Sequence, residues 1–311
     1  MNITVVLCTY NRCRSLATTL ESVAGSTVPP SDDWEVLVVD NNSPDQTRDV
    51  VEDFCRRYPR RFRYLFEPQQ GLSHARNAGI REARGDVLAF IDDDVTVAST
   101  WLQHLTAPLR NGNCGGAGGR ILPEWTSPPP DWLPIKEPYA LAPFAVFDPG
   151  LEAGPLGEPP FGANMAFQKK VFARYGGFRA DLGRCGANLI SNEDTEFGNR
   201  LLRAGEMLRY EPLAVVYHPV TKDRLRKNYL LKWWFGKGRA DIREFGTPGS
   251  SYFLGGVPLY LFRNLAGRSL RWMLELDRRR RFHRKVKVWG KLGEIVECYQ
   301  GARAAKKIRL L

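Results

Sequence analysis

The sequence predicts an α/β fold in which helices flank a mostly parallel sheet, followed by a basic, mainly helical C-terminal extension. Over the first hundred residues, short apolar runs alternate with segments of helical apolar spacing. The composition is that of a globular protein, with 43% hydrophobic and 25% charged residues among 311. The basic residues are concentrated after residue 221. Strands that alternate with helices at this spacing form βαβ units and a sheet buried on both faces.

The alternation can be followed element by element from the N-terminus. Apolar runs predict strands at Ile3–Leu7, Trp34–Val39, Arg63–Phe66 and Val87–Ile91. Helical spacing predicts helices between them at Arg14–Ala24, Thr47–Tyr58 and Ser73–Ala83. Asp40 follows the second strand and Asp92 the fourth. Ligands of open α/β sheets lie beyond the carboxyl ends of the strands, so both acids are expected to face a ligand.

The second half of the predicted sheet is less regular. Residues 111–160 are rich in glycine and proline, and we expect a long irregular excursion, with room for short strands, that forms one wall of a binding site. Further elements are predicted in the order strand Asn164–Phe167, helix Lys169–Tyr175, helix from near Ser191 to Gly205, and strand Leu213–Tyr217. A boundary near residue 220 separates a domain of residues 1–220 from a basic, aromatic-rich region of residues 221–311.

Charge distinguishes these two regions. The formal net charge is +11, but residues from Lys222 onward contain 23 basic and 7 acidic side chains, so the preceding part is mildly acidic. This asymmetry argues against the chain as a whole binding nucleic acid. The first residues, Met1–Leu7, have the pattern of a strand and not of a signal peptide, which predicts a cytoplasmic protein.

Three consecutive carboxylates, Asp92, Asp93 and Asp94, end the strongest predicted strand. Like charges this close are unfavourable unless a cation neutralises them, and Mg²⁺ or Mn²⁺ takes such oxygen ligands together with substrate phosphates. A solvated turn with a capping aspartate is the alternative. The position at the ligand side of the sheet favours the metal.

Four other segments have both a functional and a structural interpretation. Asp40 can accept hydrogen bonds from a base or ribose, or it can belong to a turn. Arg76 follows a helix N-terminus and can serve a diphosphate, or it can be solvated. Glu193 and Asp194 suit the first turn of a helix, yet a carboxylate there can be a general base. His218 ends the last predicted strand and can be a metal ligand or a packed side chain.

Taken in order, these motifs resemble the family 2 glycosyltransferases, which have the GT-A fold. The resemblance covers about residues 1–220. It rests on the segments Cys8–Arg12, Val39–Asn41, Gly71–Asn77, Asp92–Asp94, Gly162–Phe167, Gly176–Phe178, Glu193–Asp194 and His218. A Walker loop and a G-x-G-x-x-G fingerprint are both absent from the sequence.

The resemblance implies specific roles. The donor-binding residues would be Thr9, Tyr10, Arg12, Asp40, Arg76, Asp92, Asp93 and Asn164. Within this set Thr9 and Asp40 would hold the nucleoside, with Asp40 at the base. Arg76 would face the diphosphate, and the loop carrying Asn164 would line the donor-sugar and acceptor region. Asp92, Asp94 and His218 would bind Mn²⁺ or Mg²⁺, with Asp94 in direct contact. Asp194 would deprotonate the acceptor hydroxyl.

The function that follows is that of an inverting, metal-dependent glycosyltransferase. It would move a sugar from a nucleotide-diphosphate donor, with UDP or dTDP favoured, to a hydroxyl of a lipid-linked or cell-envelope glycan. A metal-dependent nucleotidyltransferase and a non-catalytic nucleotide-sugar binder are the alternatives. A nucleotidyltransferase would require a basic, glycine-rich phosphate-binding loop after the first strand. Thr9–Arg12 stands at that position with one arginine and no glycine, which disfavours this alternative.

The basic region suggests a second partner. Arg278–Arg281 are four successive arginines, and the aromatic segment Tyr229–Phe235 is flanked by Lys and Arg. Such segments bind anionic membrane surfaces, which would place the protein peripherally on the inner face of the plasma membrane. The alternative is a set of solvated helices packed by their aromatic faces. Nucleic acid is not expected as a partner.

Overall fold

The structure is a computed structural model that describes residues 1–186 and 188–308. The chain forms two compact units. Unit 1 comprises Met1–Glu124, Phe144–Ala180 and Glu193–Pro219, and unit 2 comprises Trp125–Pro143, Asp181–Asn192 and the segment from Val220 onward. The division of the chain into domains 1–220 and 221–311 stays a prediction, and the structure adds that two earlier segments group with the C-terminal one.

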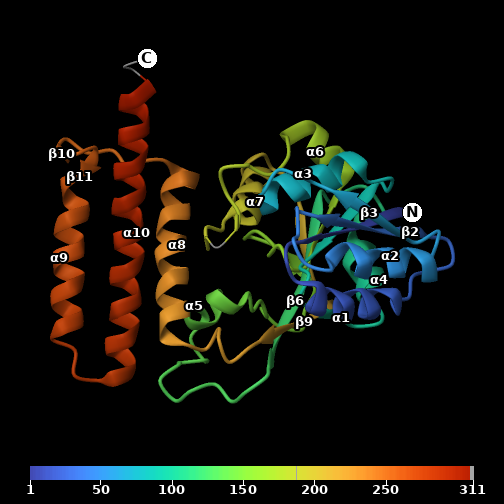
Figure 1. The fold of residues 1–311 in the computed structure, drawn as a ribbon, viewed down its shortest axis with the longest axis horizontal. Coiled ribbons are helices and arrows are strands. Elements are labelled where there is room, and N and C mark those ends of the chain that lie inside the picture. Colours follow the sequence, from blue (N-terminus) through green and yellow to red (C-terminus); the bar gives the residue numbers. More distant parts are fainter. Residues whose placement is uncertain (187, 309–311) are drawn as a thin grey trace. The chain divides into compact units, whose positions relative to one another are not determined.

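The first half of the unit 1 sheet is parallel, as predicted (Figure 1). β1 pairs with β2 on one side and β4 on the other, and β3 pairs with β2. The bounds are Asn2–Thr9 for β1, Asp33–Asp40 for β2, Phe62–Phe66 for β3 and Val87–Ile91 for β4. Because the register aligns Thr9 with Asp40, two polar residues end neighbouring strands at the same edge.

The other half of the sheet is mixed: β8 runs antiparallel to β4 and β6, and β5 and β7 run antiparallel to β9. It continues from β4 through β8, β6 and β9 to β5, with β7 beside β9. The bounds are Thr96–Val97 for β5, Gly116–Trp125 for β6, Gly154–Pro155 for β7, Met165–Gln168 for β8 and Leu208–Val220 for β9. The mostly parallel sheet with flanking helices confirms the predicted fold class.

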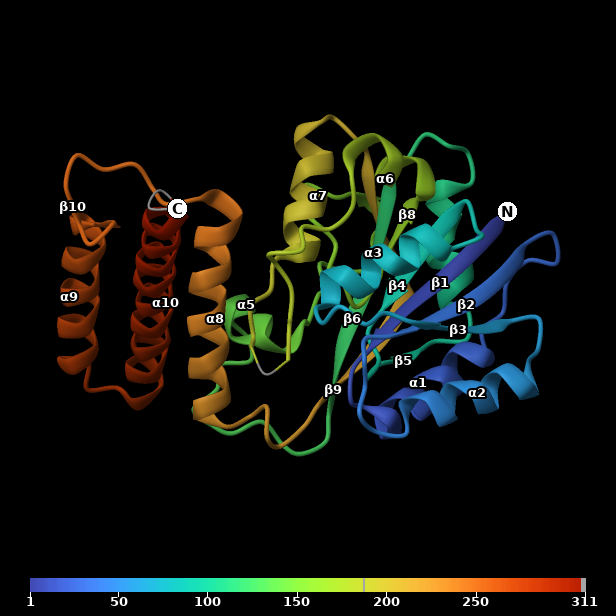
Figure 2. The same cartoon turned by 45° about the horizontal axis from the view of Figure 1, so that its top comes forward.

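Helices cover both faces of this sheet (Figure 2). α1 (Cys13–Ala24) and α2 (Thr47–Arg57) lie side by side on one face, and α3 (Leu72–Glu82) lies on the other. A Cβ on Gly79 would lie 2.4 Å from a methyl group of Val6, so glycine allows α3 to approach β1 closely. The remaining helices are α4 (Trp101–Thr106), η1 (Ala107–Leu109), η2 (Ala142–Phe144), α6 (Lys169–Tyr175) and α7 (Glu193–Arg203).

The expectation of an irregular excursion over residues 111–160 is wrong for its first part, because β6 is a ten-residue strand. Its glycines hid the strand pattern. A Cβ on Gly116 would lie 2.4 Å from the Phe167 ring, and one on Gly119 would lie 2.3 Å from the carbonyl oxygen of Ala214. Glycine is therefore required where β6 passes close to its neighbours.

Two further bounds differ from the predictions. α7 begins at Glu193, not near Ser191, with its acidic residues in the first turn, where the helix dipole favours them. β9 has 13 residues, far more than the predicted Leu213–Tyr217. Along β9 every second side chain is buried, so one face of the strand points into the core over its whole length.

Unit 2 is built from three long helices, in which α10 (Arg278–Ile308) lies between α8 (Lys227–Phe245) and α9 (Leu259–Met273) (Figures 1 and 2). It also contains the short helix α5 (Pro138–Leu141) and a hairpin of β10 (Phe253–Leu254) and β11 (Val257–Pro258). Within the described ranges, no helix has the length and apolar character needed to cross a membrane.

Glycines bring α8 and α10 into close contact. A Cβ on Gly238 would lie 2.0 Å from the carbonyl oxygen of Gly290, and one on Gly293 would lie 2.1 Å from that of Phe235. The two earlier segments of unit 2, Trp125–Pro143 and Asp181–Asn192, contact the C-terminal helices through side chains. The Trp132 ring packs edge-on against that of Phe282, with the ring centroids 4.8 Å apart, and the Asn192 amide donates a hydrogen bond to Glu244 at 2.7 Å. The predicted helical character of the C-terminal region is confirmed.

Candidate active site

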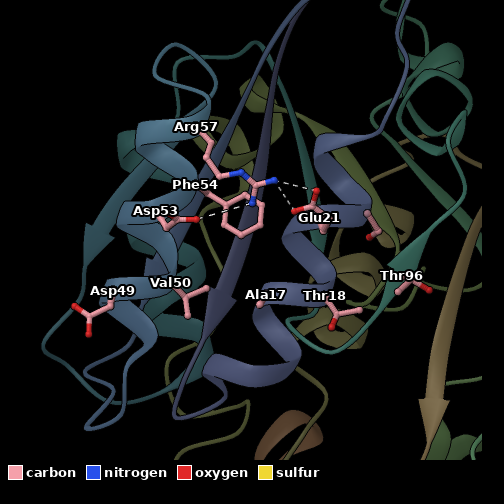
Figure 3. A pocket seen from close by; sticks show the side chains of 10 residues that line it. Ala17, Thr18, Glu21, Asp49, Val50, Asp53, Phe54, Arg57 and Thr96 are labelled. Atoms are coloured by element: carbon pink, nitrogen blue, oxygen red, sulfur yellow. Dashed lines mark hydrogen bonds and ion pairs between the residues drawn. The ribbon is translucent and has the colours of Figure 1, made fainter.

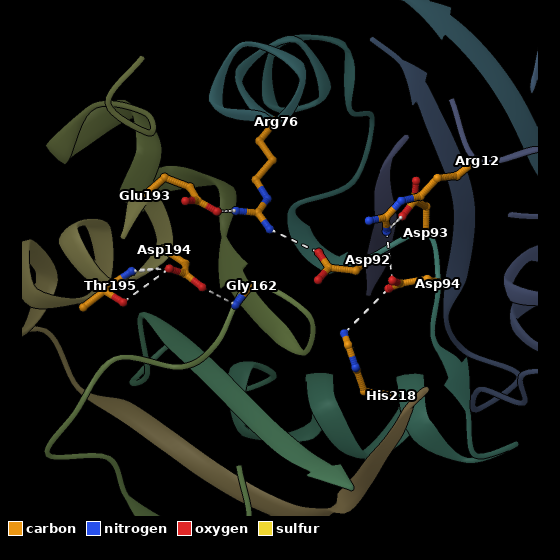
Figure 4. Close-up of polar contacts among 10 residues, drawn as sticks. All are labelled: Arg12, Arg76, Asp92, Asp93, Asp94, Gly162, Glu193, Asp194, Thr195 and His218. Carbon is orange, nitrogen blue, oxygen red and sulfur yellow. Dashed lines mark hydrogen bonds and ion pairs between the residues drawn. The ribbon is translucent and has the colours of Figure 1, made fainter. Parts of the chain in front are cut away.

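The acidic motif lies directly beyond β4, where the loop turns the three carboxylates in different directions (Figure 4). Asp93 points inward and is 6% exposed. It accepts hydrogen bonds from the Thr9 hydroxyl at 2.8 Å and from Arg12 at 2.9 Å. Burial raises the pKa of Asp93, and the nearby Asp94 acts in the same direction against the opposing effect of Arg12. Asp93 therefore fixes the motif to β1.

Asp92 and Asp94 form a group with His218 in which one ligand atom of each residue lies within 4.8 Å of the others. His218 is brought there by β9, since Tyr217 pairs with Thr96, two residues after Asp94. Its Nε2 lies 3.7 Å from a carboxylate oxygen of Asp94. Two carboxylates and one imidazole are a donor set that suits Mn²⁺, and also Mg²⁺ when phosphate oxygens and water complete its shell.

Arg12 contacts two of the three acids. Its Nη1 lies 2.9 Å from Asp93 and 2.8 Å from Asp94, while its side chain remains 38% exposed. Thr9, which was expected to hold a nucleoside, is 3% exposed and donates to Asp93. Thr9 and Arg12 thus orient the acidic motif, and the partly exposed Arg12 guanidinium is still accessible to an anion.

Arg76 lies between the acidic motif and α7 (Figure 4). It is 3% exposed, its Nη1 lies 2.7 Å from Glu193, and its Nη2 lies 3.5 Å from Asp92. Burial raises the pKa of Glu193, with Asp194 adding to the effect and Arg76 opposing it. The second oxygen of Glu193 is buried without a hydrogen-bond partner among the described residues. The structure thus gives Arg76, expected at a diphosphate, two carboxylate partners.

Asp194 is held on the other side of Arg76. One oxygen accepts a hydrogen bond from the backbone N–H of Gly162 at 2.6 Å, and the other accepts from the N–H of Thr195 at 2.7 Å. A Cβ on Gly162 would lie 2.4 Å from the Arg76 guanidinium and 3.0 Å from the Asp194 carboxylate. Glycine is therefore needed at this position for the loop to pass between the two side chains.

Asp40 and Tyr10 lie at the β1–β2 edge of the site. Asp40 is 2% exposed and accepts hydrogen bonds from the Tyr64 hydroxyl and the Ser43 N–H, both at 2.9 Å. Burial and this hydrogen bond to Asp40 raise the pKa of Tyr64 to about 12. Tyr10 is exposed. Both residues lie at the strand ends where the ligand of an open sheet is expected.

Asn164 corrects one expectation. The side chain is fully buried, its amide N–H groups donate to the carbonyl oxygens of Arg120 and Ala214, and its oxygen accepts from the Trp101 indole at 2.8 Å. Because every polar atom of the amide has a protein partner, direct contact with a donor is not supported. Asn164 instead ties β6, β9 and α4 together behind the site.

A separate open groove of about 890 Å³ lies between α1 and α2 (Figure 3). Phe54 forms part of its floor, and Arg57 bridges Glu21 and Asp53 across it. None of the residues predicted for the site lines this groove. Its ion pairs are exposed and contribute little stability.

The structure thus brings Asp92, Asp94 and His218 together, and places Arg76 between Asp92 and the Glu193–Asp194 pair. Sequence reasoning missed Tyr64, Trp101 and Gly162, which position the others. Of these three, only Gly162 was marked in the sequence, as the first residue of the segment Gly162–Phe167 that contributes to the family resemblance.

Comparisons with known proteins agree with this arrangement. The sequence model described as glycosyl transferase family 2 matches residues 4–176, more than half of the chain. The chain is 29% identical over 248 residues to the glucosyl-dolichyl phosphate glucuronosyltransferase of Haloferax volcanii, covering 76% of this chain and 75% of that one. It is also 29% identical over 245 residues to the succinoglycan biosynthesis protein ExoM of Rhizobium meliloti, covering 78% and 75%.

Among solved structures, the fold is similar to that of the mannosyltransferase PcManGT from Pyrobaculum calidifontis, solved with GDP-Man and Mn²⁺. The TM-score is 0.57 with 19% sequence identity, over 97% of this chain and 75% of that one. At this identity the similarity concerns the fold, and it confirms the GT-A type.

Proposed function

The chain belongs to glycosyl transferase family 2, and we propose that it transfers a sugar, with inversion, from a nucleotide-diphosphate donor to an acceptor hydroxyl. The observation that carries the proposal is the arrangement around Arg76: a group of two carboxylates and one imidazole on one side and the carboxylate of Asp194 on the other. Both sides belong to unit 1.

We assign the first side to the donor diphosphate. Asp92, Asp94 and His218 would hold Mn²⁺ or Mg²⁺, which when bound neutralises charge on a departing diphosphate. Arg12 presents a partly exposed guanidinium to the same place. Asp40 and Tyr10 would contact the nucleoside, for which uracil or thymine is proposed.

We assign proton removal to Asp194. Both of its oxygens accept hydrogen bonds from backbone N–H groups, so the carboxylate is oriented before an acceptor arrives. Asp194 is the carboxylate that backbone N–H groups orient at this position, and we assign no covalent nucleophile among the described residues. Attack by the acceptor hydroxyl on the side opposite the diphosphate would then invert the anomeric carbon.

We propose a lipid-linked or cell-envelope glycan as the acceptor. The relative from Haloferax volcanii is named for a glucosyl-dolichyl phosphate and the one from Rhizobium meliloti for succinoglycan, and both names support this class. An anionic membrane surface on the inner face of the plasma membrane is the proposed partner of the basic C-terminal region.

The deciding experiment is a screen of UDP-, dTDP- and GDP-sugars for hydrolysis and thermal stabilisation with and without Mn²⁺. Asp194→Asn is expected to lower kcat by about 10²–10⁴-fold while donor binding persists. Asp94→Ala is expected to abolish metal-dependent donor binding in calorimetry. Asp223→Asn, at a side chain 80% exposed in unit 2, is the matched control and should behave as the wild type.

Three results would contradict the assignment. Full turnover by Asp194→Asn would remove it from catalysis. Release of pyrophosphate from a nucleoside triphosphate would indicate the nucleotidyltransferase. Stabilisation by a donor without turnover of that donor with any hydroxyl acceptor would indicate a non-catalytic binder.

A further inference from the structure

Helix α9 is mostly apolar, and it is only partly covered by the rest of unit 2. Nine of its fifteen residues are Leu, Ala, Met or aromatic, yet Leu261 is its single buried residue in the described part of the chain. Leu270 and Met273 are 53% and 60% exposed. Since a helix in a soluble bundle normally buries its apolar stripe, α9 presents an apolar face that unit 2 itself does not cover.

The apolar surface continues past both ends of the helix. The turn between α9 and α10 carries Leu274 and Leu276, which are 69% and 93% exposed. The β10–β11 hairpin that precedes α9 carries Tyr252, Phe253 and Leu254, all exposed. α9 therefore forms the middle of a longer apolar edge. The helix itself lies at one side of the helical bundle (Figures 1 and 2).

The charges beside this edge are mostly positive; of the two acidic residues in the turn, Glu275 pairs with Arg284 at 2.8 Å and Asp277 accepts a hydrogen bond from the Arg280 N–H. α9 contains Arg263, Arg268 and Arg271 and no acidic residue. α10 begins with Arg278–Arg281. A pocket of about 530 Å³ near the turn is lined by Arg268, Arg271, Arg280, His283, Arg284 and Lys287. Burial, Lys287 and Arg284 lower the pKa of His283 to about 4, so at neutral pH the cations of this pocket are the arginines and the lysine.

We propose that α9 and the turn Leu274–Asp277 form a membrane-binding face that lies in the plane of an anionic bilayer. Leu270, Met273 and Leu276 would enter the acyl boundary, and the arginines would meet lipid phosphates. The proposal rests on the membrane association proposed above and identifies the residues responsible for it.

The chemistry favours a bilayer over other occupants. A second copy docking symmetrically through α9 would place its arginines against those of the first, because the helix has no acidic residue to pair with them. A polynucleotide would match the arginines but leave the exposed leucines in water. An anionic bilayer provides both an apolar layer and phosphates.

The test is sedimentation of the full chain with vesicles of phosphatidylcholine, with and without phosphatidylglycerol. The wild type is expected to bind the anionic vesicles and to be released by high salt. The triple variant Leu270→Gln, Met273→Gln, Leu276→Gln should bind about 100-fold more weakly. The matched control is Leu151→Gln, Met207→Gln, Leu213→Gln, at side chains of unit 1 that are similarly exposed, and it should bind as the wild type does.

A second pair of variants separates the contribution of charge to vesicle binding from that of apolar insertion. Arg278→Gln, Arg279→Gln, Arg281→Gln should lose the preference for phosphatidylglycerol, whereas Arg48→Gln, Arg56→Gln, Arg81→Gln in unit 1 should keep it. The proposal would be overturned if the wild type failed to bind anionic vesicles. It would also be overturned if the variant Leu270→Gln, Met273→Gln, Leu276→Gln (the leucine variant below) bound them as the wild type does. A dimer in ultracentrifugation that the leucine variant abolishes would assign the face to a second copy instead.

The outcome is independent of the catalytic proposal. Vesicle binding is measured without donor or metal, and Asp194→Asn should bind vesicles normally. Donor hydrolysis by the leucine variant, measured without membranes, should equal that of the wild type. Loss of hydrolysis with intact vesicle binding would therefore contradict the catalytic assignment alone.

Discussion

In unit 1 charged side chains are buried beside partners, whereas in unit 2 the tightest contacts join backbones and many charged side chains lie outside. Arg76 and Asp93 are each at most 6% exposed and each contacts groups of the acidic site. In unit 2, Gly238 and Gly293 mark the α8–α10 contact. The difference suggests that unit 1 is organised around chemistry and unit 2 around a surface. Four substitutions test this comparison.

The largest effect is expected from Arg76→Ala. The change leaves Glu193 and Asp92 without their shared cation, and removal of one partner from a buried ion pair costs about 3–5 kcal/mol. Arg81→Ala, on the same helix but 63% exposed, should cost less than about 0.5 kcal/mol. Urea unfolding of both variants measures the difference. Equal stability of the two would show that the buried network does not support unit 1.

Gly238→Ala tests the backbone contact of unit 2. The new methyl group would lie 2.0 Å from the Gly290 carbonyl oxygen, so α8 and α10 must separate, at a cost of about 3 kcal/mol. Gly267→Ala in α9 has no neighbour within 4 Å and should stabilise by about 0.5–1 kcal/mol through helix propensity. Urea midpoints should move in opposite directions. A neutral Gly238→Ala would contradict the close packing.

Trp101→Phe tests a neutral buried bond in unit 1. The indole N–H is the donor to the Asn164 oxygen, which would be left unpaired in the core, at a cost of about 2 kcal/mol. Trp34→Phe, at a buried Trp that stacks under Arg61, removes a similar volume and should cost about 1 kcal/mol. If the two variants unfold at the same urea concentration, the hydrogen bond adds nothing.

His283 should give the smallest effect, as a pH dependence of unit 2. Its pKa of about 4 in the folded chain lies below the unfolded value, so the unfolded state binds the proton more tightly between pH 4 and 6.5. Stability should therefore decrease as the pH is lowered from 6.5 to 4, by about 1 kcal/mol after allowance for partial exposure. His283→Gln should flatten the profile. An equally steep profile in the variant would assign the slope to other groups.

Much of the fold could be predicted because local pattern and tertiary environment agree. The apolar runs of β1, β2 and β4 are buried on both faces, as a parallel sheet requires. β6 could not be predicted, since its glycines reflect the approach of Phe167 and Ala214, which are distant in sequence. The register that makes β9 a 13-residue strand likewise depends on pairing with distant strands.

The site divides in the same way. The resemblance grouped Asp92, Asp94 and His218, and the structure places their ligand atoms together. The partners of Arg76 were not foreseeable: Glu193 lies 117 residues away, and either residue alone has the pattern of a helix terminus. The full burial of Asn164 was hidden for the same reason, since its three partners lie on three separate elements.

The alternation of side chains along β9 has a consequence for how this chain tolerates insertions and deletions. His218 shares its face with Ala214 and Val216, so removing one residue earlier in the strand would send the imidazole to the opposite side and bring a neighbour into its place. Affinity for a divalent ion would then vanish even with every ligand residue still encoded. Metal titration of the proposed site would thus also test strand alignment, because a slip of a single position displaces His218.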